Sequence, residues 1–157
     1  WSNLTRLEGF KLEKKCLQLL NHKFKCVCGL NCNHFPILKD YNEKEFKLVL
    51  SNCGVSIRDY KNKCLELKKN NIKIKKFSLK DPIKQIDCII FNLKRCKIKH
   101  LDLYHEAKNI CINKNGILSI IDFDIGSVHH KNHKDIQFYN NLRDNLINIV
   151  NSIQYYN

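Results

Sequence analysis

The sequence contains no methionine, only two prolines and five glycines, and no long hydrophobic run. Because a translated chain begins with methionine and this one begins at Trp1, we expect a fragment or a processed product. No apolar run is long enough to span a bilayer, and no signal peptide precedes the first amphipathic segment. We therefore expect a protein of a reducing, cytoplasmic compartment that has no membrane partner.

Acidic residues are also scarce. The chain has 28 lysines and arginines against 15 aspartates and glutamates, which gives a net charge of +13. Such an excess favours polyanionic partners, whether nucleic acid, an acidic protein surface or nucleotide phosphates. Many lysines alternate with asparagine and isoleucine, as at 70–80, so a solvated basic surface explains the charge equally well.

Cysteine is abundant, but the number and spacing of the cysteines do not indicate a disulfide framework. The nine cysteines are an odd number at irregular spacing, whereas secreted scaffolds carry paired cysteines. Cys16, Cys64, Cys88 and Cys111 lie within apolar periodic runs, where a free cysteine behaves as a small buried hydrophobic residue. We expect these thiols to be reduced.

The pattern of apolar residues predicts an α+β protein with one layered domain over residues 1–157. Periodicity predicts helices where apolar residues recur at helical spacing and strands where short apolar runs flank turn residues. The Asn-Gly pair at 115–116 predicts a hairpin. The expected helices are 6–20, 57–69 opened by Ser56, 82–97 opened by Asp81, and 136–153. The expected strands are 35–41, 45–50, 109–112 and 117–121.

Polar residues occur at irregular intervals between His100 and Gly126, in HLDLYHEAKNICINKNGILSIIDFDIG. Asp102 lies in a loop after a helix, where a carboxylate can accept a proton. Asn109 opens one strand of the expected hairpin and Asp122 closes the other, so their side chains should converge. An amide oxygen and a carboxylate suit Mg²⁺ shared with phosphates, and a nearby aspartate completes the set that phosphoryl transfer requires.

This stretch resembles the core of the protein kinases, in which His-Arg-Asp-Leu is followed by asparagine, a hairpin and Asp-Phe-Gly. Here the motifs stand as His100-Leu101-Asp102-Leu103, Asn109 and Asp122-Phe123-Asp124. The resemblance implies that Asp102 is catalytic and orients a hydroxyl nucleophile. It also implies that Asn109 and Asp122 hold Mg²⁺, that ATP donates the phosphate, and that serine or threonine of a protein accepts it.

The resemblance extends towards the N-terminus. The segment 13–22 is similar to the helix whose glutamate pairs with the ATP-contacting lysine, which nominates Glu13. The segment 46–57 is similar to a strand and the hinge, where Ser51, Asn52 and Cys53 would offer backbone groups to adenine. This implies a kinase-like fold with a remnant N-lobe and hinge at 1–53 and a reduced C-lobe at 54–157.

Several features depart from the kinase pattern. The chain has neither a glycine-rich phosphate loop nor a Val-Ala-Ile-Lys strand. Asp102 and Asn109 are seven residues apart rather than five, and Lys108 in the longer loop could replace the lysine of the family. Asp124 replaces glycine and could bind a second Mg²⁺ or lie in solvent. Asp135 is the candidate for the aspartate that braces the catalytic loop.

A second group of candidate ligands is Cys26, Cys28, Cys32 and His34, within nine residues. Three thiols and an imidazole could bind a tetrahedral Zn²⁺. The Cys-x-Cys spacing is tighter than the usual Cys-x₂-Cys, and a loop that happens to contain cysteines explains the pattern equally well. His34 could alternatively anchor the turn at His34-Phe35-Pro36.

These observations leave three hypotheses for function. The first is a Mg²⁺-dependent kinase-like phosphotransferase that uses ATP, with an acidic protein as one candidate for the hydroxyl acceptor. The second is a pseudokinase, an interaction module without catalysis, which the missing glycine loop and lysine favour. The third is a basic nucleic-acid-binding protein with a zinc loop, although no aromatic residues are interleaved with its basic runs as a stacking platform requires.

Overall fold

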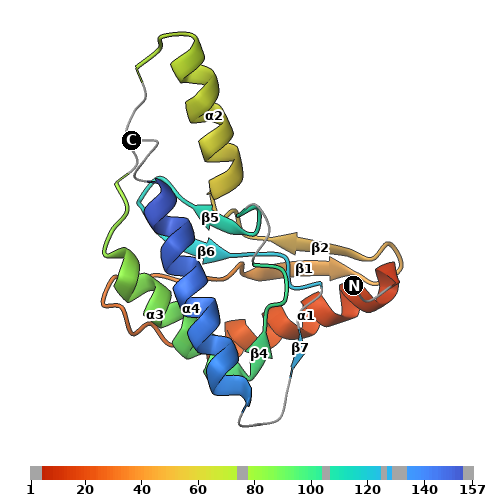
Figure 1. Cartoon of the computed structure of the whole chain (residues 1–157). Coiled ribbons are helices and arrows are strands. Elements are labelled where there is room, and N and C mark those ends of the chain that lie inside the picture. The colour runs from red at the N-terminus through yellow and green to blue at the C-terminus, as the bar shows by residue number, and fades with distance from the viewer. Residues whose placement is uncertain (1–4, 74–77, 104–106, 125–126, 129–133, 154–157) are drawn as a thin grey trace.

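A computed structural model describes residues 5–73, 78–103, 107–124, 127–128 and 134–153. Helices and short antiparallel sheets alternate along the chain (Figure 1), which confirms the predicted α+β class. The helices are α1 (Arg6–Lys23), α2 (Ile57–Lys69), α3 (Pro82–Cys96) and α4 (Lys134–Ile153). The strands are β1 (Leu38–Asn42), β2 (Lys47–Leu50), β3 (Val55–Ser56), β4 (Ile98–Lys99), β5 (Ile110–Ile112), β6 (Leu118–Ile120) and β7 (Ser127–Val128).

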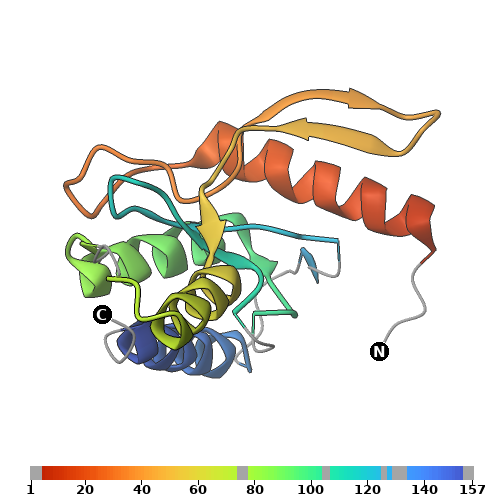
Figure 2. The same cartoon turned by 90° about the horizontal axis from the view of Figure 1, so that it is seen from above.

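The first helix, α1, begins at a reciprocal cap. The Thr5 hydroxyl accepts a hydrogen bond from the Glu8 N–H, and the Glu8 carboxylate accepts one from the Thr5 N–H. This arrangement satisfies two backbone donors that the first turn leaves without helical partners. The buried face of α1 includes Leu17 and Leu20, and the helix runs alongside the β1–β2 hairpin (Figure 2).

The β1–β2 hairpin confirms the two strands expected before residue 50. It is antiparallel, with Leu38 opposite Leu50 and Asn42 opposite Lys47. The Asn42 side chain shapes the turn, because its Oδ1 accepts the N–H groups of Lys44 and Glu45. Short polar side chains favour turns by this kind of local bond.

A second hairpin, β5–β6, confirms the strands predicted around the Asn-Gly turn. Ile110 lies opposite Ile120 and Ile112 opposite Leu118, and β3 pairs with the other edge of β5. Gly116 has φ +75°, and a Cβ there would lie 2.0 Å from the Ser78 carbonyl oxygen. Glycine is therefore required at this position for both conformation and space.

The start of α3 differs from the prediction. Asp81 was expected to cap the helix with its side chain, but it has φ 39° and makes no side-chain cap bond. In this left-handed conformation the Asp81 carboxylate does not reach the first helical N–H groups. Gln85 instead uses its side chain to bind the β5–β6 turn: its Nε2 donates to Gly116 O at 2.9 Å and its Oε1 accepts from Leu118 N at 2.7 Å.

One buried apolar cluster draws side chains from all four helices and from β5 and β6. The β5–β6 hairpin lies between α1 on one side and α4 on the other (Figure 2). Phe123, just after β6, is fully buried in this cluster. The core thus holds both ends of the hairpin in place. Among the described helices, none combines the length and the apolar character needed to cross a membrane.

Candidate active site

The β5–β6 hairpin brings its two polar ends together. The Ile121 N–H donates to the Asn109 carbonyl oxygen at 3.0 Å, which continues the ladder to the edge of the hairpin. The buried Asn109 side chain then reaches the preceding loop, where its Nδ2 donates to Asp102 O at 2.9 Å and to Asp102 Oδ2 at 3.1 Å. Since the amide nitrogen makes these bonds, the amide oxygen is the atom suited to bind a cation.

Asp102 lies at the centre of this loop and is 7% exposed. Its Oδ2 accepts the bond from Asn109 and lies 3.3 Å from Lys108 Nζ. The structure therefore brings Asp102, Lys108 and Asn109 into one group, although the loop between them is longer than in kinases.

His100 connects this group to the end of β6. Its Nε2 donates to the Ile121 carbonyl oxygen at 2.8 Å, and its Nδ1 accepts the Asp102 N–H at 3.2 Å. The ring of His100 also contacts the Phe123 ring edge-on at 4.8 Å. Burial lowers the pKa of His100, so the imidazole is neutral and its bonds define one tautomer. The sequence indicates His100 only as part of the motif and gives no signal for this positioning role.

Three carboxylates face one another beside this group. Burial, followed by the hydrogen bond and charge of Asp124 and the charge of Glu13, raises the pKa of Asp122 to about 7, while Lys108 opposes the shift. Burial raises the pKa of Glu13, whose carboxylate accepts a hydrogen bond from the Phe123 N–H and faces the charge of Asp124. The partner of Glu13 within the described chain is therefore a backbone group.

A cleft of about 350 Å³ opens next to these carboxylates. We call it, together with Glu13, Asp122 and Asp124, the acidic cleft. Its walls come from the middle of α1, the end of β2 with the segment that follows it, strand β5, and the residues just after β6. The lining residues are Glu13, Pro36, Leu50, Ser51, Cys53, Gly54, Cys111, Ile121 and Asp122.

The three residues predicted to contact adenine are placed differently from one another. Ser51 and Cys53 line the cleft, whereas Asn52 does not. The Asn52 side chain instead accepts the Gly54 N–H at 2.8 Å and so shapes the turn. The Ser51 N–H donates to Ile37 O at 2.9 Å, so this backbone donor has a partner within the chain.

Asp135, at the start of α4, forms an ion pair with Lys99. Both side chains are largely buried, with 18% and 17% exposed. Lys99 directly precedes His100, and β4 carries it against the adjoining β7 strand. Asp135 therefore pairs with the residue that directly precedes His100 in the sequence.

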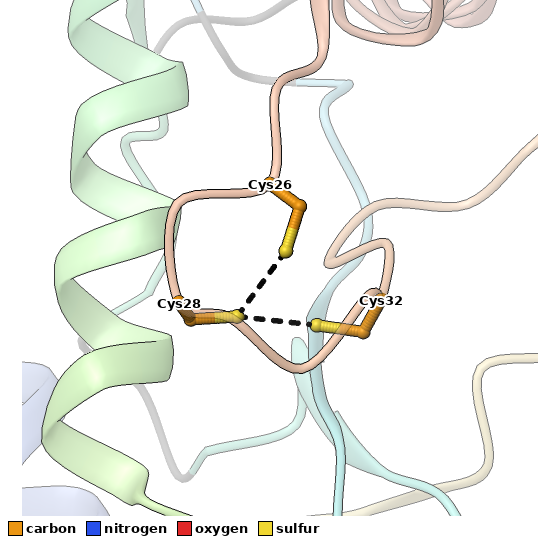
Figure 3. Close-up of side chains that lie close together, drawn as sticks. All are labelled: Cys26, Cys28 and Cys32. Atoms are coloured by element: carbon orange, nitrogen blue, oxygen red, sulfur yellow. Dashed lines mark hydrogen bonds between the residues drawn. The ribbon is translucent and has the colours of Figure 1, made fainter.

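Cys26, Cys28, Cys32 and His34 also come together, in the connection between α1 and β1. Figure 3 shows the three cysteine side chains pointing towards one another from a single loop beside α3. We call residues 26–34 the cysteine–histidine loop. Cys88 of α3 lies against the same group. The sequence offered no signal for this contact, because Cys88 fits the apolar periodicity of its helix.

No protein-family model matches the chain, and no curated protein is significantly similar to it.

Proposed function

We propose that the protein is a kinase-like phosphotransferase that moves the γ-phosphate of ATP to a hydroxyl group with the help of Mg²⁺. The observation that carries this proposal is the position of the acidic cleft. Its walls include Ser51 and Cys53 of the segment after β2 together with Glu13 and Asp122. The hydrogen-bonded group of Asp102, Lys108 and Asn109 belongs to the same hairpin ends.

The donor atoms fit Mg²⁺. Asp122, Asp124 and the Asn109 amide supply the hard oxygen ligands that this ion prefers. Burial, and after it the neighbouring carboxylates of Asp124 and Glu13, raise the pKa of Asp122, while Lys108 opposes the shift. A divalent cation relieves such repulsion between carboxylates. When bound, Mg²⁺ would neutralise the phosphate charge that develops during transfer.

The role that the geometry supports for Asp102 is to orient the hydroxyl acceptor. Its Oδ2 is fixed by Asn109 Nδ2 and faces the Lys108 ammonium. Positioning by a fixed carboxylate is the main contribution that a protein makes to phosphoryl transfer. Lys108 would add positive charge near the transferred group, and the net charge of +13 favours an acidic protein as the acceptor.

In this proposal the two parts of the chain correspond to two lobes. Residues 1–53, which comprise α1 and the β1–β2 hairpin, would form the remnant of an N-lobe together with the hinge. Residues 54–157 would form a reduced C-lobe that carries Asp102, Asn109 and Asp122. The bond from the Phe123 N–H to Glu13 would join the two lobes at the catalytic site.

The test is Mg²⁺-dependent ATP hydrolysis by the full natural protein, in which water accepts the phosphoryl group that the substrate hydroxyl would otherwise take. We expect Asp102→Asn to lower turnover roughly 100-fold or more, since positioned acid–base groups contribute at least this much, while ATP affinity changes less than about twofold. Asp59→Asn is the control, because Asp59 is exposed on α2. If the unmodified protein binds ATP without turning it over, it is a pseudokinase. If it neither binds nor turns over ATP, the proposal is refuted.

A further inference from the structure

The cysteine–histidine loop contains ligand atoms at spacings that match a metal site. Cys28 Sγ lies 3.5 Å from Cys26 Sγ, 3.4 Å from Cys32 Sγ and 3.6 Å from His34 Nε2, and Cys32 Sγ lies 3.3 Å from the same nitrogen. A zinc ion with tetrahedral Zn–S bonds of about 2.3 Å separates its ligands by roughly 3.8 Å. A disulfide would require sulfurs about 2.05 Å apart.

The orientation of His34 provides an independent observation. This side chain is fully buried, and its Nδ1 lies 2.7 Å from the Leu118 carbonyl oxygen. Because a carbonyl oxygen only accepts, Nδ1 carries the ring proton and Nε2 presents a lone pair. That lone pair points at Cys28 and Cys32. Histidine ligands are oriented in this way, with one nitrogen on the metal and the other donating to a carbonyl or carboxylate.

The Cys28 thiol and the His34 ring are buried, whereas Cys26 and Cys32 are half-buried. Thiols are poor donors and poor acceptors, yet Cys26 Sγ, Cys32 Sγ and His34 Nε2 all lie against the Cys28 thiol. A cation at their centre would replace several weak contacts with strong bonds to thiolates. Soft sulfur ligands with one imidazole select Zn²⁺ over Mg²⁺ or Ca²⁺.

We propose that Cys26, Cys28, Cys32 and His34 bind one Zn²⁺, and that Cys88 supports the site without binding the ion. Cys88 Sγ accepts the Val27 N–H at 3.3 Å and donates to Lys25 O at 3.9 Å. These bonds hold the backbone on either side of Cys26. Four ligands from one short loop already complete a tetrahedral site, which is closed in the manner of structural zinc.

The site would fasten the loop to two other parts of the molecule. His34 binds β6 twice, through Nδ1 to Leu118 O and through its carbonyl oxygen, which accepts the Ile120 N–H at 2.9 Å. On the other side, the Asn92 side chain of α3 bonds both the N–H and the carbonyl oxygen of Lys25, each at 2.9 Å. Zinc would thus fix the end of α1 relative to β6 and α3, independently of any phosphotransfer.

The experiment uses the full natural protein, purified under reducing conditions and supplied with Zn²⁺ or Co²⁺. We expect one equivalent of zinc per chain by elemental analysis. With cobalt we expect thiolate-to-cobalt charge-transfer absorption and the intense d–d bands of a tetrahedral ion. Zinc binds the folded chain, so a chelator should lower the melting temperature and added zinc should restore it.

Two variants that each remove one neighbouring thiol make a matched pair. Cys28→Ala should lose the stoichiometric metal, whereas Cys88→Ala should retain it. If Cys28→Ala does not fold, the cobalt spectrum of the unmodified protein still decides the question. Reduced protein that binds neither ion stoichiometrically would overturn the proposal, and so would loss of the metal in Cys88→Ala with retention in Cys28→Ala.

Discussion

The cysteine–histidine loop and the acidic cleft are our two proposed cation sites, and the chain builds them in opposite ways. The loop would take its soft ligands from residues 26–34, with Cys88 of α3 beside them. The cleft would take hard oxygen ligands from α1 and from both ends of the β5–β6 hairpin. A local site depends on the conformation of one loop, whereas a composite site depends on how separate elements pack.

The difference in charge separates the two sites further. Backbone N–H groups, first that of Cys32, lower the pKa of the Cys26 thiol to about 6, while burial raises the pKa of the Cys32 thiol. The acidic cleft holds Glu13, Asp122 and Asp124 against Lys108. The cleft should therefore respond to pH and to Mg²⁺ near neutrality, and the loop to zinc and to chelators.

The largest expected effect comes from Asp122→Asn. Changing an outer residue of a metal site costs about 10–100-fold, so removing a direct ligand should lower Mg²⁺-dependent ATP turnover at least about 100-fold. The zinc content of this variant should equal that of the unmodified protein, as measured by elemental analysis on the same sample. Parallel loss of zinc would mean that the two sites are not separate.

Two glycines offer a matched comparison of backbone tolerance. Gly54, in the cleft, has φ +98°, and a Cβ there would lie 2.1 Å from Ile112 O, whereas Gly29 in the loop has φ +76° with no atom within 4 Å. Alanine strains both conformations, but only Gly54→Ala also clashes with backbone. Gly54→Ala should lower the free energy of unfolding by about 2 kcal/mol more than Gly29→Ala. Urea unfolding measures both, and equal losses would contradict the described packing of the cleft.

The acidic cleft should also make stability and Mg²⁺ binding depend on pH. The pKa of an unfolded aspartate is about 3.9. Burial, followed by the charges of Asp124 and Glu13, raises the pKa of Asp122 in the folded chain to about 7. Asp122 therefore stabilises the fold most at acid pH, and this contribution is lost as the pH rises through 7. Because Mg²⁺ requires the carboxylate, its affinity should rise roughly tenfold from pH 6 to pH 8.

Calorimetric titration at the two pH values measures this change. Glu13→Gln, which removes one of the neighbouring charges, should move the transition to lower pH. A Mg²⁺ affinity that is the same at pH 6 and pH 8 would contradict the assignment of Asp122 as a ligand.

The smallest expected effect lies outside both sites. Arg143 of α4 pairs with Asp87 of α3 at 2.6 Å, with 38% and 50% of these side chains exposed. Exposed ion pairs contribute about 0–1 kcal/mol. Arg143→Gln should therefore change the free energy of unfolding by less than about 1 kcal/mol, with zinc content and Mg²⁺ affinity unchanged. A larger change in the free energy of unfolding, in zinc content or in Mg²⁺ affinity would show that the packing of α3 against α4 controls the two sites.

Much of the local structure could be predicted from sequence, because it depends on near neighbours. The helix at 57–69 begins where Ser56 accepts the Asp59 N–H, and the Asn-Gly turn gives the β5–β6 hairpin. The two-residue strands β3, β4 and β7 were not predicted, since they are too short to show alternation. The prediction that the Asp81 side chain caps α3 was wrong, because backbone conformation rather than residue type decides whether the side chain reaches the first helical N–H groups.

The candidate sites likewise combine contacts that the local sequence indicates with contacts that it does not. The approach of Asn109 to Asp122 follows from a hairpin that the sequence indicates. The bond from Phe123 to Glu13 and the contact of Cys88 with Val27 depend on packing between distant segments. Neither has a signal in local sequence, because a glutamate on a helix and a cysteine in an apolar run look structural. The catalytic and metal-binding roles remain predictions.

The central claim is that the acidic cleft binds ATP together with Mg²⁺. The most direct measurement is equilibrium binding of ATP to the full natural protein by calorimetry, with and without Mg²⁺. We predict saturable binding at a single site that is stronger with Mg²⁺ and that loses this Mg²⁺ dependence in Asp122→Asn. No binding at millimolar ATP, or equal binding by Asp122→Asn in the presence of Mg²⁺, would contradict the claim.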